Sequence, residues 1–154
     1  EPGIFFDGYH GMPDATIEAW RDLWFRTGDA GSVDEDGYLT FTGRLTDSIR
    51  RRGENVSAWE VERVLTEHKD VDEAAVFGVP SDLGEEEVMA VVVGDSVDLQ
   101  ELWQYAAGKL PGFAVPRYMR VQDELPKTPT GRVQKHQLTD ADGETSEWER
   151  GLTR

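Results

Sequence analysis

Hydrophobic residues recur at helical spacing in two stretches of the chain. The first stretch covers residues 57–68 and opens on Ser57, a residue type that caps a first helical turn. The second covers residues 98–110 and ends at Pro111, because proline cannot continue a helix. The core-facing positions are Val61, Val64, Leu65 and His68 in the first helix, and Leu99, Leu102, Trp103, Ala106 and Leu110 in the second. Each predicted helix therefore presents an apolar face to a core.

Runs rich in Val and Ala predict strands between these helices. Residues 71–79 and 87–93 are the two longest runs, and residues 80–86 between them are too many for a two-residue hairpin turn. Shorter strands are expected at residues 38–42, 48–52 and 118–122, and short helical turns at residues 16–20 and 133–138. Helices and strands mixed in this way predict an α+β fold.

The composition narrows the class of protein. The 154 residues include 38% hydrophobic residues, enough for a packed core, and carry a net charge of −15. An acidic surface opposes binding to nucleic acids or anionic membranes, and no apolar run approaches the roughly 20 residues of a membrane span. The chain has no cysteine, and its three histidines form no ligand pattern, so we expect neither a disulfide framework nor a metal site.

The start of the chain bears on its origin. It opens on Glu1-Pro2-Gly3 without Met, which predicts a piece of a longer protein. No charged and then apolar leader precedes the predicted fold, so we expect a soluble, cytoplasmic protein.

Four motifs follow one another at characteristic distances. They are Trp24-Phe25-Arg26-Thr27-Gly28-Asp29, Gly43-Arg44, Arg52-Gly53-Glu54-Asn55-Val56 with Trp59-Glu60-Val61-Glu62, and Leu125-Pro126-Lys127-Thr128-Pro129-Thr130-Gly131-Arg132. An Arg-Thr-Gly-Asp quartet alone is most often a turn. All four in this order resemble the adenylate-forming superfamily, which contains acyl-CoA synthetases, adenylation domains of peptide synthetases and firefly luciferase. The wording of residues 47–55 is most similar to the carnitine/crotonobetaine-CoA ligase branch.

The resemblance implies a division of the chain. Residues 1–45 correspond to the end of the large N-terminal adenylation domain, including its last strands. Residues 46–138 correspond to the small mobile C-terminal domain, a three-stranded sheet with flanking helices and a short hairpin. Residues 139–154 form a polar tail.

Two residues match the nucleotide-binding positions of the family. Asp29 corresponds to the carboxylate that holds the ribose hydroxyls, a task suited to a group that accepts several hydrogen bonds. Arg44 corresponds to the arginine that reaches the ribose and α-phosphate, for which a permanently charged guanidinium is well suited. The alternatives are a turn-ending aspartate and a surface salt bridge.

The hinge position of the family is usually Asp or Lys, and in this chain it is Thr46, followed by Asp47. A hinge needs backbone freedom more than a particular side chain, so hinge function is expected at Thr46.

Several residues match the CoA-binding segments of the family. Gly53 and Glu54 belong to the loop that lines the pantetheine tunnel, where glycine allows close backbone approach, and Arg52 replaces a second glycine of many relatives. Phe113 and Arg117 match a segment near CoA. Arg50 and Arg51, with Arg117, could meet CoA phosphates, although solvated arginines on an acidic domain are the alternative.

Arg132 stands where the family places a lysine that bridges the acyl carboxylate and the α-phosphate during adenylation. A cation at this position offsets the charge that builds up as the carboxylate attacks. Arginine keeps the charge but is larger and planar, so the exchange is not conservative. Drift at a tolerant position is the alternative explanation.

The resemblance implies the C-terminal portion of an ATP-dependent acyl-CoA ligase, which activates a carboxylate as acyl-adenylate and transfers it to CoA. Its ligands are ATP or AMP, CoA, and Mg²⁺ bound mainly by the N-terminal domain. We expect this portion to be inactive by itself. Two alternatives remain: a nucleotide- or CoA-binding module without catalysis, which Arg132 and Thr46 favour, and an adenylation domain that loads a carrier protein.

Overall fold

The computed structural model describes residues 7–81, 84–139 and 147–149. Its elements follow in the order α1 (Pro13–Ala19), η1 (Arg21–Leu23), β1 (Asp29–Val33), β2 (Leu39–Arg44), η2 (Leu45–Asp47), β3 (Ser48–Arg51), β4 (Glu54–Ser57), α2 (Ala58–Thr66), β5 (Glu73–Pro80), β6 (Glu86–Val93), α3 (Leu99–Lys109), β7 (Tyr118–Val121), α4 (Lys135–Thr139) and β8 (Glu147–Glu149). The predicted α+β class is confirmed. Within the described residues, no helix is long and apolar enough to cross a membrane.

The larger sheet lies in the part of the chain from residue 46 onward, which is called the small domain below, and has the strand order β5-β6-β7-β8. Strands β5 and β6 pair antiparallel, β6 and β7 pair parallel, and β7 and β8 pair antiparallel. Because a parallel neighbour requires a crossover, α3 connects β6 to β7. The sequence predicted three strands in this sheet, and residues 147–149, within the predicted polar tail, add a fourth strand beside β7.

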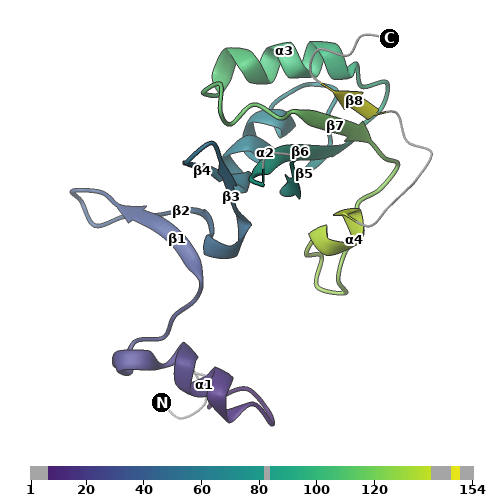
Figure 1. Ribbon diagram of the computed structural model, residues 1–154. Coiled ribbons are helices and arrows are strands. Elements are labelled where there is room, and N and C mark those ends of the chain that lie inside the picture. The colour runs from purple at the N-terminus through teal and green to yellow at the C-terminus, as the bar shows by residue number, and fades with distance from the viewer. Residues whose placement is uncertain (1–6, 82–83, 140–146, 150–154) are drawn as a thin grey trace.

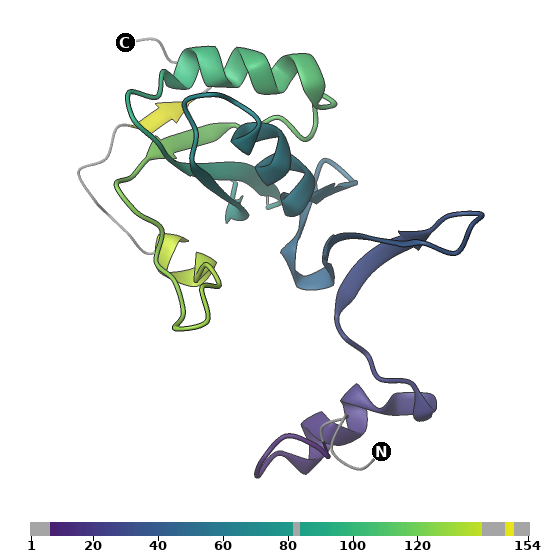
Figure 2. The ribbon, with the colours of Figure 1, turned by 180° about the vertical axis from the view of Figure 1, so that it is seen from behind.

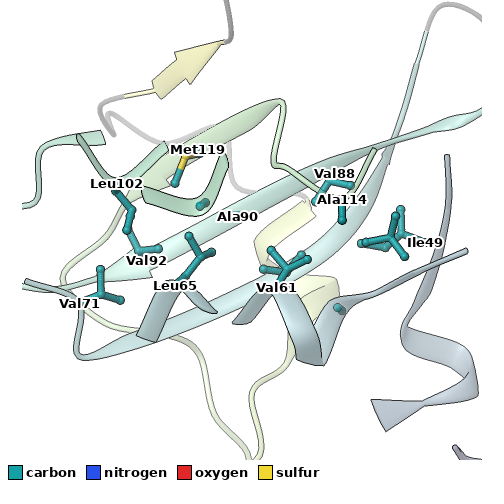
Figure 3. Close-up of a cluster of buried hydrophobic side chains, with 14 residues drawn as sticks. Ile49, Val61, Leu65, Val71, Val88, Ala90, Val92, Leu102, Ala114 and Met119 are labelled. Carbon is teal, nitrogen blue, oxygen red and sulfur yellow. The ribbon is translucent and has the colours of Figure 1, made fainter. Parts of the chain in front are cut away.

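Alternating residues of β6 divide the core into two layers. Val88, Ala90 and Val92 face one cluster, whereas Met89 and Val91 face the other. The first cluster also contains Val61 and Leu65 of α2, Leu102 and Ala106 of α3, and Met119 of β7, several of which Figure 3 labels. The second cluster contains Leu125 and Leu138, which places the C-terminal segment with α4 on the opposite face of the sheet from α2 and α3. Figure 1 shows α3 above the sheet and α4 below it.

Side chains cap the two main helices. The hydroxyl of Ser57 accepts a hydrogen bond from the Glu60 N–H at 3.4 Å, as its position before α2 predicted. The carboxylate of Asp98 accepts from the N–H groups of Gln100 and Glu101 at 2.8 and 3.1 Å before α3. These caps satisfy backbone donors that the first turn of a helix leaves without an internal partner.

Residues 7–45 extend away from the small domain. Figures 1 and 2 show α1 and the β1–β2 hairpin to one side, joined to the rest through η2. Helix α1 has no buried residue. Several large apolar side chains of this part are exposed, among them Ile17 at 70%, Leu23 at 94%, Trp24 at 78% and Leu39 at 75%.

Candidate functional site

Asp29 and Arg44 face each other across the β1–β2 hairpin. Their Cα atoms are partners in the strand register, and Arg44 Nε lies 2.8 Å from Asp29 Oδ1. The side chains of Arg44 and Asp29 are 41% and 36% exposed. The structure therefore brings together the two residues that the resemblance assigns to the nucleotide, as a half-exposed ion pair.

The turn before Asp29 wraps around the Arg44 side chain. The guanidinium of Arg44 donates to the carbonyl of Thr27 at 3.0 Å, and the Asp29 N–H donates to the Thr27 hydroxyl at 3.1 Å. Gly28 has φ +75°, a left-handed conformation that favours glycine, and its carbonyl accepts from the Leu45 N–H at 2.8 Å. The Thr-Gly-Asp sequence thus holds the ion pair at the end of the hairpin.

Thr46 lies in the short helix η2, between the hairpin and the small domain. Its hydroxyl donates to Asp47 Oδ1 at 3.3 Å, while Asp47 Oδ2 lies 3.3 Å from Lys135 Nζ. Lys135 also pairs with Glu62 Oε1 at 2.7 Å. Asp47, the residue after the predicted hinge, is therefore joined to the small domain by its ion pair with Lys135.

Strand β2 rests on the first turn of α2. The Ser57 hydroxyl donates to the carbonyl of Thr42 at 2.9 Å, and the rings of Phe41 and Trp59 meet nearly edge to face with centroids 6.3 Å apart. Gly43 lies at the same contact with φ +134°, and a Cβ atom there would come within 3.4 Å of Ser57 Oγ and Trp59 Cβ. These contacts connect strand β2, before Thr46, with helix α2, after it.

Arg132 is presented by a tight turn after β7. The Thr128 N–H donates to the Arg132 carbonyl at 2.8 Å, and the Arg132 N–H donates to the Thr128 hydroxyl at 3.0 Å. Gly131, with φ +82°, allows the chain to close in this way. The Arg132 side chain is exposed, and its guanidinium has no ion pair or hydrogen bond with any other residue that the structure describes.

A cleft of about 520 Å³ lies between η2 and this turn. Its charged lining residues are Asp47, Glu62, Arg132 and Lys135, with Thr128 and His136 beside them. Among the described residues Lys135 pairs with both carboxylates of this cleft, whereas the Arg132 guanidinium has no such partner.

The β3–β4 turn carries Arg52 and Gly53. These two residues have φ of +52° and +81° and join the paired residues Arg51 and Glu54. Positive φ at both central residues is the conformation that matches the twist of a two-residue hairpin. The Arg52 N–H donates to a Glu85 carboxylate oxygen at 2.6 Å, which fastens the turn to the residues before β6.

Arg51 does not lie where the sequence suggested. We expected it to meet CoA phosphates with Arg50, but it is 3% exposed and donates to the carbonyls of Phe113 and Val115 at 2.9 and 2.8 Å. It also forms an ion pair with the buried Glu87. The expectation is therefore wrong for Arg51, because a buried guanidinium cannot reach a ligand.

The remaining CoA candidates are accessible. Arg52 and Glu54 are exposed, and Phe113 is 37% exposed. Arg117 pairs with Glu87 at 3.3 Å and lies over the Tyr118 ring at 5.2 Å, with its side chain 38% exposed. Figures 1 and 2 agree that the β3–β4 turn and the segment leading into α4 lie on different sides of the small domain.

Sequence reasoning assigned no role to Glu62 or Glu87. Glu62 accepts from the Val76 N–H at 2.9 Å besides pairing with Lys135, and Glu87 joins Arg51 to Arg117. Glu62 comes directly after the core-facing Val61 and so lies at the border of the apolar face of its helix. This position was the available signal for a structural role of Glu62.

Comparisons with known proteins find relatives over most of the chain. Residues 60–132 match the family described as AMP-binding enzyme C-terminal domain. The chain is 41% identical over 131 residues to a probable CoA ligase of Humulus lupulus, covering 83% of this chain and 25% of that protein. It is 39% identical over 135 residues to a fatty acid–[acyl-carrier-protein] ligase of Streptomyces coeruleorubidus, covering 86% of this chain and 26% of that protein.

A solved structure shows the same arrangement of elements. The crystal structure of ATP-bound MatB from Rhodopseudomonas palustris superimposes with a TM-score of 0.79 and 38% identity, over 87% of this chain and 27% of that one. The chain thus spans about a quarter of the length of the relatives that it matches.

Proposed function

We propose that this chain is the C-terminal portion of an ATP-dependent acyl-CoA ligase, because residues 60–132 match the AMP-binding enzyme C-terminal domain and the chain is similar to a probable CoA ligase. In the proposed reaction a carboxylate attacks the α-phosphate of ATP, pyrophosphate leaves, and the thiol of CoA then displaces AMP from the acyl-adenylate. The observation that carries the proposal is the half-exposed Asp29–Arg44 ion pair, held directly before the hinge segment of a domain that also carries Arg132.

The Asp29–Arg44 pair suits a nucleotide. A carboxylate has about four lone-pair sites and a guanidinium five N–H donors, so their mutual contact leaves capacity on both groups. In the proposal Asp29 accepts hydrogen bonds from the ribose hydroxyls, and Arg44 donates to the α-phosphate. The partial exposure of both side chains and the ATP-bound state of the related MatB structure support these roles.

Arg132 supplies positive charge during adenylation in this proposal. Its turn is closed by hydrogen bonds between the Arg132 backbone and Thr128, which fix where the side chain starts, and the guanidinium is paired with no described residue. A cation placed beforehand stabilises the charge that develops on the carboxylate and the phosphate oxygens.

CoA would bind on the other side of the small domain. The Arg52–Glu54 turn and the segment with Phe113 and Arg117 offer exposed groups of suitable chemistry: a glycine that allows close approach, an aromatic ring and cations for phosphates. Rotation about Thr46 would bring this side to the adenylate after the first step.

A preceding domain of the same polypeptide would complete the site. The exposed apolar side chains of residues 7–45, such as Leu23 and Trp24, support this, because large apolar surface is rarely left in water. In the proposal that domain supplies the remaining nucleotide contacts, the Mg²⁺ site and the pocket for the carboxylate. The cytoplasmic location of the protein remains a prediction from the sequence.

The test uses the full-length protein. Pyrophosphate release from ATP is measured with a panel of carboxylates that includes carnitine and crotonobetaine, followed by mass detection of the CoA thioester. We expect pyrophosphate release with at least one carboxylate and thioester formation when CoA is added. Binding of ATP or CoA without pyrophosphate release for any carboxylate would instead identify a binding module without catalysis.

The relative that acylates a carrier protein supports a second candidate acceptor. The same assay therefore compares CoA with a phosphopantetheinylated acyl carrier protein. We expect CoA, because the exposed cations at Arg52 and Arg117 suit its phosphates. Acyl transfer to the carrier protein and not to CoA would favour the second candidate.

A further inference from the structure

Arg51 is a buried cation that links two separate segments of the small domain. It is the last residue of β3, directly before the Arg52–Gly53 turn, and it is 3% exposed. Its Nη1 donates to the carbonyls of Phe113 and Val115 at 2.9 and 2.8 Å. One guanidinium therefore joins the β3–β4 turn to the segment before β7, which lies more than sixty residues away in sequence.

Glu87 of β6 completes this link. Its carboxylate is 5% exposed and pairs with Arg51 Nε through one oxygen, while the other lies 3.3 Å from Arg117 Nη1. A buried carboxylate between two guanidiniums holds both in place, because loss of either partner leaves charge without compensation in the interior. Arg117 keeps 38% of its side chain exposed, so Glu87 orients it without covering it.

The segment that Arg51 holds has further fixed points. Trp103 Nε1 donates to the carbonyl of Pro116 at 3.1 Å, and the Arg117 N–H donates to the carbonyl of Val88 at 2.9 Å. Ala114 belongs to the same apolar cluster as Ile49 of β3, as Figure 3 shows. Side-chain and backbone contacts from other elements thus order a segment that has no strand or helix of its own.

We propose that Arg51 and Glu87 are positioning residues for the thioester step, which hold the Arg52–Glu54 turn and the Phe113–Arg117 segment in a fixed relation. The inference rests on the proposed function, in which these two segments bind CoA. Neither residue touches CoA. They set the spacing and direction of the groups that do, so that less freedom is lost when CoA binds.

The test replaces Arg51 with lysine in the full-length protein. Arg51→Lys keeps the charge but cannot reproduce the paired contacts of the planar guanidinium. We expect the KM for CoA to rise about 10-fold in the thioester reaction, while pyrophosphate release and the KM for ATP stay within about two-fold of the parental values. Glu87→Gln, which keeps the size of the side chain but removes its charge, should raise the KM for CoA in the same way.

Arg120→Lys is the matched control. Arg120 is also 3% exposed and donates to a backbone carbonyl, that of Leu138 at 2.9 Å, but it contacts neither proposed CoA segment through that bond. It should leave the KM for CoA unchanged. An equal rise in the Arg120→Lys control, or an equal loss of both half-reactions in Arg51→Lys and Glu87→Gln, would reduce Arg51 to a general folding role and overturn the inference.

Failure of the proposed function has a different signature. If the parental protein forms no thioester with CoA, the proposed function is refuted and the inference with it. If the parental protein forms thioester and both variants keep its KM for CoA, the proposed function stands and the positioning role is refuted.

Discussion

Replacing Arg132 with alanine should impair adenylation without impairing folding. The Arg132 side chain is exposed, and the hydrogen bonds that close its turn use the backbone of Arg132 with Thr128. The free energy of unfolding should therefore change by no more than about 0.5 kcal/mol. Loss of one preorganised charge should slow adenylate formation by about 10²-fold, equivalent to about 3 kcal/mol.

The assay separates the two half-reactions in the full-length protein. Pyrophosphate release from acid and ATP reports adenylation, and thioester formation from a pre-made acyl-adenylate reports the second step. Arg132→Ala should slow the first and leave the second close to the parental rate. Lys127→Ala serves as control, because this neighbouring cation of the same turn pairs with Glu73 at 2.7 Å and does not line the cleft that Arg132 lines.

Two results would refute the reasoning. If Arg132→Ala leaves pyrophosphate release unchanged, Arg132 has no role in adenylation, and a module without catalysis becomes the better explanation. If Lys127→Ala slows the reaction as much, the effect belongs to the turn and not to Arg132. The variant Arg132→Lys adds a further distinction: restored activity means that the site accepts an ammonium, whereas a large loss means that it is built around the guanidinium.

Four further outcomes are expected. Residues 1–154 alone should release no pyrophosphate from ATP with any carboxylate, and turnover free of contaminating enzyme would show that they form a complete site. In the full-length protein, Arg117→Ala should raise the KM for CoA with adenylate formation nearly intact, and equal loss of both steps would indicate a packing role. Arg52→Gly should raise the free energy of unfolding in urea by up to about 1 kcal/mol, because its φ of +52° strains a side-chain-bearing residue; lower stability would show that the side chain contributes more than the strain costs. The hydrogen bond from Lys109 lowers the pKa of Glu67 below its usual 4.5, so the stabilisation from this pair is present above that pH and is lost as the pH falls through the lowered pKa. In Lys109→Met an NMR titration should find the pKa of Glu67 moved upward, and an unchanged pKa would contradict the assignment.

The helices of the small domain could be predicted because their signals are local. Ser57 caps α2 and Asp98 caps α3, and the core-facing positions Val61, Leu65 and Leu102 are fully buried. A cap depends on a residue type beside a periodic apolar face, and both are readable without knowledge of distant contacts.

Other elements depend on partners that the sequence does not name. Strand β8 consists of Glu147–Glu149 and joins the sheet at its edge, where backbone hydrogen bonds to β7 are sufficient and no apolar alternation is required. Strand β1, Asp29–Val33, was not predicted because it has no alternating pattern, and its register with β2 shifts at a bulge between Ala30 and Gly31.

The burial of Arg51 could have been predicted from its position two residues after Ile49, but the neighbouring arginines pointed to a solvent-exposed cluster. Ile49 and Arg51 are two positions apart in a strand and therefore point to the same side, and Ile49 is part of the core. Three consecutive arginines suggested a solvated cationic cluster instead. The carboxylate of Glu87 and the carbonyls of Phe113 and Val115, all distant in sequence, make the inward direction favourable.

The contacts around Thr46 limit where the chain can swivel. On one side Arg44 is bound to Asp29 and Thr27, and the Leu45 N–H to the Gly28 carbonyl; on the other, Asp47 is bound through Lys135 to the small domain. The torsions between these anchors are those of Leu45 and Thr46, and a rotation there would also have to break the Ser57–Thr42 hydrogen bond and separate Phe41 from Trp59. In the proposed hinge the anchors on either side define the joint, so a threonine between them would serve as well as the acidic or basic residue that the resemblance leads one to expect.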